Sequence, residues 1–149
     1  MIRIKAVDEE NILDVCRLKT KQDDDIATIK KYSLRNAISV AETKYHSEMH
    51  PNAIYNNNVL IGFFVYKRTE KSADTAIICR FMIDDKFQKN GIAEKAFEHV
   101  LRGLKIQGVK KAVFIIGNIN ENAKRLCLSY GFQFTGKNSE SGYCYEAEL

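Results

Sequence analysis

The segment from Phe81 to Ala93 has the residue types that bind phosphate where a strand gives way to a helix. Apolar residues end at Ile83, a polar turn follows, and Gly91 and Ala93 stand where the next helix would begin. The first amides of a helix lack partners within it and carry the positive end of its dipole, so they attract anions. Gly91 can adopt dihedrals closed to other residues and leaves room for a ligand. The segment therefore favours a pyrophosphate site, although a glycine here can also do no more than shape a turn.

A second segment of interest runs from Asn120 to Phe132. Its spacing predicts an amphipathic helix in which Asn120 caps the start, Leu126 and Tyr130 lie in the core, and Gly131 ends the helix. Helix capping alone would explain the asparagine. Its side chain can also hydrogen-bond a ligand that lies beside the helix start, and the two roles are compatible.

Together the two segments resemble the signature elements of the GCN5-related N-acetyltransferase (GNAT) superfamily. Gln88-x-x-Gly91-x-Ala93 is similar to the Q/R-x-x-G-x-G/A loop of that superfamily, and the residues from Asn120 resemble its N-x-x-A-x-x-L-Y-x-x-x-G-F helix. In the superfamily the loop holds the pyrophosphate of acetyl-CoA, and the preceding strand offers backbone groups to the pantetheine arm. Two motifs in this order, separated by a helix and a strand, are considerably more specific than either one alone.

The resemblance covers almost the whole chain and implies acetyl-CoA as the cosubstrate. It implies transfer of the acetyl group to a primary amine of a small molecule by direct attack in a ternary complex, with backbone amides near Met82 polarising the carbonyl. Ile78 to Asp84 and the hairpin around Gly62 look most like the spermine/spermidine (diamine) N-acetyltransferase branch, so a polyamine is one candidate acceptor. The residues expected to bind the cofactor are Phe81, Met82, Ile83, Gln88, Lys89, Asn90, Gly91, Ile92, Ala93, Glu94 and Asn120.

The residues that would move protons depart from the family pattern. Acetyl transfer needs a neutral amine, a polarised thioester and a proton for the departing thiolate. Related polyamine enzymes commonly use an Asp or Glu on the central strand and a Tyr on the later helix, where this sequence has Cys79 and Cys127. A buried thiol is a poor base, yet Cys127 can in principle protonate another thiolate. The two cysteines are the catalytic candidates, core packing is the alternative, and water, Tyr130, His99 or His46 are other proton routes.

These replacements leave a second hypothesis open, in which the chain is a CoA-binding regulatory or interaction module that has lost turnover. A nucleic-acid-binding domain is a third hypothesis that ranks last. The net charge of +4 is modest, and Lys and Arg are spread along the chain without forming a block that interleaves with aromatic residues. The acidic residues Asp23 to Asp25, Glu42 and Glu48 can attract a cationic amine or simply form a solvated face.

The elements that must position these residues follow from hydrophobic periodicity. The order β-αα-βββ-α-β-α-ββ predicts an α/β fold of the GNAT type, with a mixed, mostly antiparallel sheet of about seven strands and helices on both faces. We expect strands near residues 1–6, 53–55, 59–66, 75–83, 111–116, 132–135 and 142–148, and helices near residues 12–18, 33–41, 91–107 and 120–130.

Composition is that of an ordinary globular protein. The chain has 149 residues, 45% hydrophobic and 28% charged, and we expect one acetyltransferase domain over residues 1–149. Its apolar runs are shorter than a membrane-spanning helix needs, and its start alternates like a strand, so we expect a cytoplasmic protein without a membrane partner. The four cysteines lack metal-ligand spacing, so we expect reduced thiols and no metal. The apolar-aromatic tail from Gly142 to Tyr145 could form the surface of a homodimer.

Overall fold

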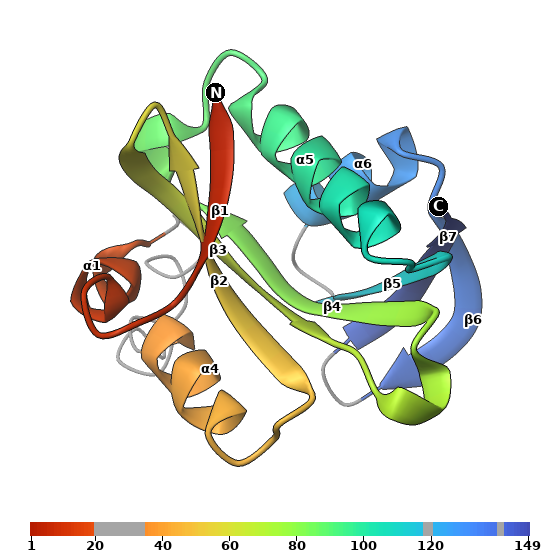
Figure 1. Ribbon diagram of the computed structural model, residues 1–149. Helices are drawn as coiled ribbons and strands as arrows, with labels where there is room; N and C mark the ends of the chain where they lie inside the picture. The colour runs from red at the N-terminus through yellow and green to blue at the C-terminus, as the bar shows by residue number, and fades with distance from the viewer. Residues whose placement is uncertain (20–34, 118–120, 140–141) are drawn as a thin grey trace.

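The computed structural model describes residues 1–19, 35–117, 121–139 and 142–149 (Figure 1). They form a seven-stranded sheet in the order β1-β2-β3-β4-β5-β7-β6. The element order agrees with the predicted α/β arrangement, which is therefore confirmed. The elements are β1 (Ile2–Ala6), α1 (Ile12–Arg17), α4 (Arg35–Thr43), β2 (Met49–Asn56), β3 (Val59–Lys67), β4 (Thr75–Ile83), α5 (Ile92–Ile106), β5 (Lys111–Ile116), α6 (Glu121–Ser129), β6 (Gln133–Ser139) and β7 (Gly142–Glu148).

Neighbouring strands are antiparallel except at one place. The exception is the pair β4 and β5, which run parallel and are connected through α5. A parallel pair needs a crossover connection because the chain must return to the starting edge, and a helix is the usual crossover. The carboxyl ends of β4 and β5 consequently meet at the same edge of the sheet, where α5 and α6 each begin.

One apolar cluster lies on each face of the sheet. One cluster contains Phe97 of α5 and Cys127 of α6, and it packs on the sheet face that we call the α5 face. The other contains Val15 of α1 and Val40 of α4, and it packs on the opposite face, the α4 face. Helices therefore cover both faces, as the sequence predicted.

The aromatic ring of Phe97 is the centre of the first cluster. Phe97 is completely buried, and its ring centroid lies 5.2–5.8 Å from those of four other aromatic residues. Aromatic pairs at such distances add to the free energy gained from burial. They join α5 to β4, β5 and the end of α6; the four partners are Phe81, Phe114, Tyr130 and Phe132.

A buried asparagine links the elements around the second cluster through hydrogen bonds. Asn36 of α4 is 2% exposed, and its Nδ2 donates to the carbonyl of Val15 at 2.9 Å. Its Oδ1 accepts from Nε and one terminal nitrogen of Arg80, at 2.8 and 2.6 Å. Because a buried amide is costly unless it is hydrogen-bonded, these contacts fix α1, α4 and β4 relative to one another.

Strand β2 begins earlier than the sequence predicted, at Met49, and it contains Pro51. Proline within a strand pattern normally argues against a strand, since it has no N–H to donate. Here β1 pairs no further than Ala6 with Asn52, and the carbonyl of Pro51 accepts from Val7 beyond that last pair. The nitrogen of Pro51 faces the same side as its carbonyl, toward β1 and beyond the last β1 pair, so its missing N–H costs no hydrogen bond to β3. The last hairpin is also longer than predicted, since β6 extends to Ser139.

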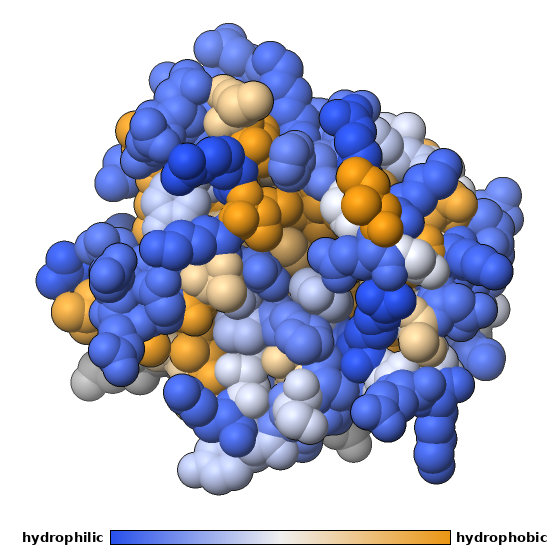
Figure 2. Space-filling model, in the orientation of Figure 1, coloured by the Kyte–Doolittle hydropathy of each residue, from blue (hydrophilic) through white to orange (hydrophobic). Residues whose placement is uncertain are grey.

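The surface seen in Figure 2 is mainly hydrophilic, with apolar atoms gathered in the middle over β1 and α5. Ile2 and Ile4 of β1 are partly buried and pack on the cluster that contains Phe97. None of the helices among the described residues is long and apolar enough to cross a membrane.

We predict that Gly62→Ala destabilises the protein, because β3 and β4 approach too closely there for a side chain. A methyl group at Gly62 would lie 2.5 Å from the carbonyl oxygen of Met82 and 2.6 Å from Cδ1 of Ile83. Overpacking of this kind lowers the free energy of unfolding by about 1–3 kcal/mol, measured by denaturant titration. Gly103→Ala is the matched control, since nothing lies within 4 Å and the residue is in a helix. It should raise stability by about 0.5–1 kcal/mol, and equal stabilities of the two variants would contradict the prediction.

Candidate active site

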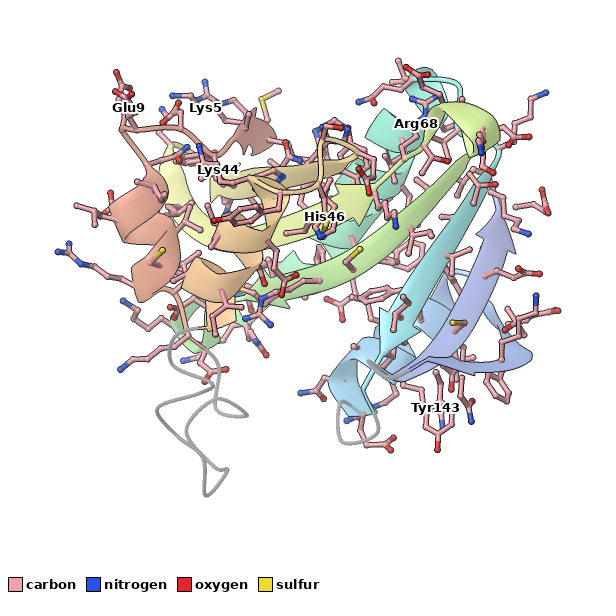
Figure 3. The ribbon with its side chains drawn as sticks, turned by 90° about the horizontal axis from the view of Figure 1, so that it is seen from below. Lys5, Glu9, Lys44, His46, Arg68 and Tyr143 are labelled. Atoms are coloured by element: carbon pink, nitrogen blue, oxygen red, sulfur yellow. The ribbon has the colours of Figure 1, made fainter. Side chains whose placement is uncertain are left out.

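Strands β4 and β5 part before they end. Their last paired residues are Ile78 and Phe114, whereas β4 continues to Ile83 and β5 to Ile116. Figure 3 shows the two strands, in yellow-green and cyan, starting side by side near Arg68 and diverging toward their carboxyl ends. Among the described residues, the backbone from Cys79 to Ile83 thus has no strand partner on the β5 side. In α/β sheets such a point at the carboxyl ends of strands is where ligands bind.

A β-bulge at Cys79 marks where β4 begins to leave β5. On β3, the neighbours Val65 and Tyr66 pair with Arg80 and Ile78, so Cys79 is one residue too many. Ile78 and Phe81 both pack on the α5 face although they are three residues apart, which alternation forbids without an extra residue. Bulges bend a strand and increase its twist, and they are common beside active sites.

The exposed edge of β4 offers the backbone groups of Phe81 and Ile83. Asp84 donates its N–H to Ile61 of β3, and strand residues alternate in the direction of their hydrogen-bonding groups. Met82 therefore also faces β3, while Phe81 and Ile83 face the gap beside β5. The predicted amides near Met82 are, in this geometry, those of its two neighbours. The three side chains point elsewhere: those of Phe81 and Ile83 pack on the α5 face and that of Met82 on the α4 face.

The turn between β4 and α5 presents amides without partners. Asn90 and Gly91 have φ values of 59° and 70°, and the latter is the N-cap of α5. Within the described part of the chain, the N–H groups of Asn90, Gly91, Ala93 and Glu94 have no hydrogen-bond acceptor. Lys89 is exposed next to them. Free amides at the positive end of a 15-residue helix form a suitable site for an anion.

The carboxylate of Glu94 lies close to these amides and opposes an anion. Its Oε2 lies 3.7 Å from where a β-carbon on Gly91 would stand, and the residue is exposed. An acidic side chain in the first turn favours the helix dipole in the same way as a bound anion does. Because Glu94 is exposed, its side chain is free to turn away from the amides. Ile92 and Ala93 are partly buried and pack on the Phe97 cluster.

Two side chains hold the loop against the end of β4. The Nε2 of Gln88 donates to the carbonyl of Ile83 at 2.6 Å, so the glutamine of the predicted motif acts on the loop's own backbone. Asp84, which is 3% exposed, accepts from the amides of Lys86 at 3.0 Å and Lys19 at 3.1 Å. Sequence reasoning missed Asp84. An aspartate directly after an apolar strand, two residues before the amide that it accepts from, is a turn signal that could have identified it.

The two predicted catalytic cysteines lie on opposite faces of the sheet. Cys127 is completely buried in the cluster of the α5 face, and burial raises the pKa of its thiol to about 12. Cys79 is partly buried against the α4 face, where burial raises the pKa of its thiol, the charge of Lys67 lowers it and that of Glu42 raises it. The arrangement does not let the two thiols act as a pair. It also opposes the predicted acid role of Cys127, because an inaccessible thiol with a high pKa is a weak proton donor.

The other proton routes considered from the sequence are scattered over the molecule. His46 follows α4, with its Nδ1 3.8 Å from a carboxylate oxygen of Glu48. His99 is a partly exposed residue of α5. Tyr130 follows α6, and its hydroxyl donates to the carbonyl of Glu94 at 2.9 Å, which ties α6 to the first turn of α5. Burial raises the pKa of this hydroxyl, and the charges of Glu98 and Glu94 raise it further.

Some predicted residues cannot be placed, and one has another partner. Asn120 and the acidic residues 23–25 lie outside the described residues. Glu48 contacts Lys67 at 3.8 Å as well as His46, so its charge is already shared between two basic groups.

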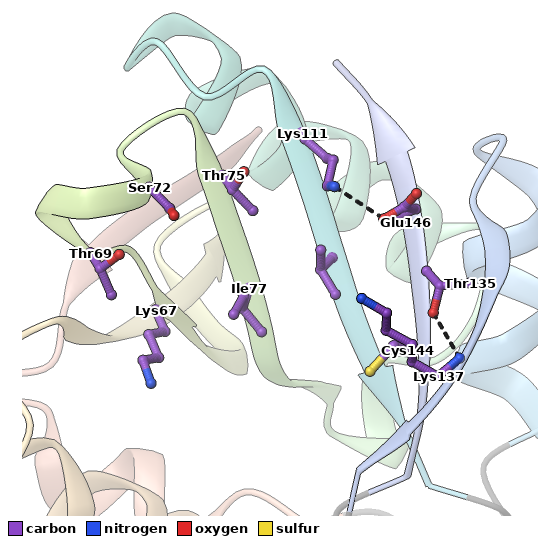
Figure 4. A pocket seen from close by; sticks show the side chains of 11 residues that line it. Lys67, Thr69, Ser72, Thr75, Ile77, Lys111, Thr135, Lys137, Cys144 and Glu146 are labelled. Carbon is purple, nitrogen blue, oxygen red and sulfur yellow. Dashed lines mark hydrogen bonds and ion pairs between the residues drawn. The ribbon is translucent and has the colours of Figure 1, made fainter.

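A hollow of about 660 Å³ lies on the α4 face, over the halves of β4 and β5 that are still paired (Figure 4). Along β5, residues buried on the α5 face alternate with partly exposed residues on the α4 face. Two of the partly exposed residues, Lys111 and Val113, line this hollow. Ile77 and Val113 are its floor, one position before the strands part. Its rim and walls come from β3, the turn after it, β4, β5, β6 and β7: Lys67, Thr69, Ser72, Thr75, Lys111, Thr135, Lys137, Cys144 and Glu146.

Comparison with known proteins agrees with this geometry. The spermine/spermidine N(1)-acetyltransferase of Bacillus subtilis (strain 168) is 25% identical over 142 residues, which cover 91% of this chain and 90% of that protein. The PaiA N-acetyltransferase of Thermoplasma acidophilum, solved in complex with coenzyme A, has a TM-score of 0.72 at 15% identity and covers 100% of this chain and 99% of its own. Ard1 of Thermoplasma volcanium has a TM-score of 0.70 at 17% identity, with coverage of 99% and 97%.

The two solved structures show that the fold is shared, and the match to a family model identifies the family. The model of the Acetyltransferase (GNAT) family matches residues 11–132, which include the bulged strand, the amide-bearing turn and α6. The chain therefore belongs to the GNAT family of acetyltransferases.

Proposed function

We propose that this protein transfers an acetyl group from acetyl-CoA to a primary amine of a small molecule, by direct attack within a ternary complex. The observation that carries the proposal is the set of four amides without a partner among the described residues, at the end of a strand that has left its neighbour; they belong to Asn90, Gly91, Ala93 and Glu94. A pyrophosphate would accept from these amides, with Lys89 adding positive charge. CoA is the ligand named for the Thermoplasma acidophilum relative.

In the proposed complex the pantetheine arm takes the place of the missing strand beside β4. Its amide groups would bond to the backbone of Phe81 and to the N–H of Ile83, whose carbonyl already accepts from Gln88. Asn120 is proposed as a further contact. The thioester carbonyl would then lie near these N–H groups, which stabilise the negative charge that develops on its oxygen. The edge of β4 is preformed, so little reorganisation is needed when the charge appears.

The chemistry requires one bond to form and one to break. The amine nitrogen attacks the thioester carbon, and the carbon–sulfur bond breaks with its electron pair passing to the CoA sulfur. The nitrogen gives up a proton and the thiolate takes one, so the products are an amide and the CoA thiol. We propose that water in the open hollow carries the proton from the amine, since the hollow lies directly beside the point where the strands part.

The first experiment follows thiol release from acetyl-CoA in the presence of a panel of primary amines. Spermine and spermidine belong in the panel because the Bacillus subtilis relative is named for them. We expect amine-dependent thiol release that saturates in both substrates. Calorimetric binding of CoA without turnover across the panel would instead favour a binding module, the second hypothesis drawn from the sequence.

We predict that Gly91→Ala weakens CoA binding and that Gly108→Ala does not. Both glycines flank α5 with left-handed φ, 70° and 94°, so alanine costs about 1–2 kcal/mol of strain in each. Only the first disturbs the proposed pyrophosphate amides, and we expect its Kd for CoA to rise about tenfold, as for loss of one hydrogen bond to a charged group. Titration calorimetry measures this. Equal Kd values for the two variants would show that CoA binds elsewhere.

We predict that Cys127→Ala retains kcat within about threefold, because a completely buried thiol cannot deliver a proton to CoA. Loss of a general acid would instead lower kcat by about 10²–10⁴-fold. The assay is run at a temperature at which circular dichroism shows the variant to be folded, since the substitution opens a small cavity. Cys16→Ala, on α1 of the other face, is the control for removing a thiol. A large fall in kcat for Cys127→Ala alone would restore the role predicted from the sequence.

A further inference from the structure

The hollow on the α4 face has the position that an acceptor substrate needs. CoA, as proposed, approaches the parted strands along the start of α5, so a second substrate must reach them from another side. The hollow ends at Ile77 and Val113, one position before the parting, and α1 and α4 do not line it. Lys67 on its rim is paired with Ile77 of β4, two residues before Cys79, so the rim adjoins the bulge. Its volume of about 660 Å³ suits a small molecule.

The charges that line the hollow are mainly positive. The described residues that line it include three lysines and one glutamate, and the glutamate, Glu146, is 3.3 Å from Lys111. Lys67 shares its charge with Glu48 at 3.8 Å. Lys137 has no ion-pair partner among the described residues, and Figure 4 shows its side chain reaching from β6 over Cys144 toward β5. Within the described part of the chain this ammonium group is uncompensated, and it projects into the hollow.

Hydroxyl groups complete a lining that suits an anion. Three threonines and a serine line the hollow beside the lysines, and each hydroxyl can donate a hydrogen bond. The Oγ1 of Thr135 accepts from the amide of Lys137 at 3.1 Å, which fixes the backbone from which that lysine extends. Ammonium and hydroxyl donors around one space bind carboxylate or phosphate through charge-assisted hydrogen bonds. A polyamine would bring several positive charges against the same ammonium group, and like charges repel.

We infer that the acceptor carries an anionic group, a carboxylate or a phosphate, on the same molecule as its amine, and that Lys137 binds this group. The inference rests on the proposed function and specifies its substrate class. The anion lies in the hollow over β5, and the amine reaches past the bulge at Cys79 to the thioester. The cationic acceptor expected from the polyamine branch is not what this lining favours.

The test compares amines that differ in the anion alone. Ethanolamine, serine and O-phosphoethanolamine share a primary amine and a two-carbon frame, with no anion, a carboxylate and a phosphate respectively; spermidine is the cationic arm. Thiol release from acetyl-CoA is measured for each, together with calorimetric binding of each amine to the CoA-bound protein. We expect serine or O-phosphoethanolamine to have a kcat/KM about tenfold above that of ethanolamine or spermidine.

Lys137→Glu should remove this preference by raising KM for the anionic amine about tenfold or more, with kcat little changed. Lys105→Glu is the matched control, an exposed lysine in the last turn of α5 that does not line the hollow, and it should leave the preference unchanged. Turnover that favours ethanolamine or spermidine would uphold the proposed function and overturn this inference. Tighter binding of the anionic amines without thiol release would uphold the anion site at Lys137 and overturn the proposed function. Neither binding nor turnover of the anionic amines would also overturn the inference.

Discussion

The loss of pairing between β4 and β5 is the constraint on which the rest of the site depends. The backbone N–H and C=O groups of a paired strand are bonded to its neighbour, so they cannot bind a ligand. A strand that ended where the pairing ends would have no free backbone groups beyond that point. Here β4 continues beyond Ile78 while β5 turns away, so an ordered, extended edge stays inside the sheet without a partner. The bulge at Cys79 and the crossover through α5 both contribute to this geometry. Everything proposed for the donor, the carbonyl and the acceptor refers to this one gap.

Rigid packing holds the gap open from both faces. Phe97 joins α5 to β4 and β5 through its ring contacts, and Asn36 joins α4 to the other side of β4 through Arg80. Gln88 and Asp84 then fix the turn that carries the free amides. The site is thus built on strands and helix ends with few degrees of freedom, as a preorganised electrostatic site requires.

The fold and the loop could be predicted from the sequence because both depend on patterns of residues that are close together in the chain. Hydrophobic periodicity identified the strands and helices, and Gly91 at the start of a helix identified the turn. Contacts between distant segments escaped prediction. The amide of Lys19 bonds to Asp84 across 65 residues, and the hollow is assembled from segments between Lys67 and Glu146. The opposite placement of Cys79 and Cys127 also required the structure. The single-domain extent, cytoplasmic location and homodimer stay predictions.

The extra residue in β4 has a consequence for how this strand tolerates change. Losing one residue from a central strand normally turns every later side chain over to the wrong face. At the bulge the outcome is reversed, since removing Cys79 would leave Arg80, Phe81, Met82 and Ile83 on the faces that they now occupy. What would disappear is the bend. The shortened strand could then run straight and pair with β5 along its whole length. This pairing would close the gap, while the residues of the hydrophobic core stayed the same.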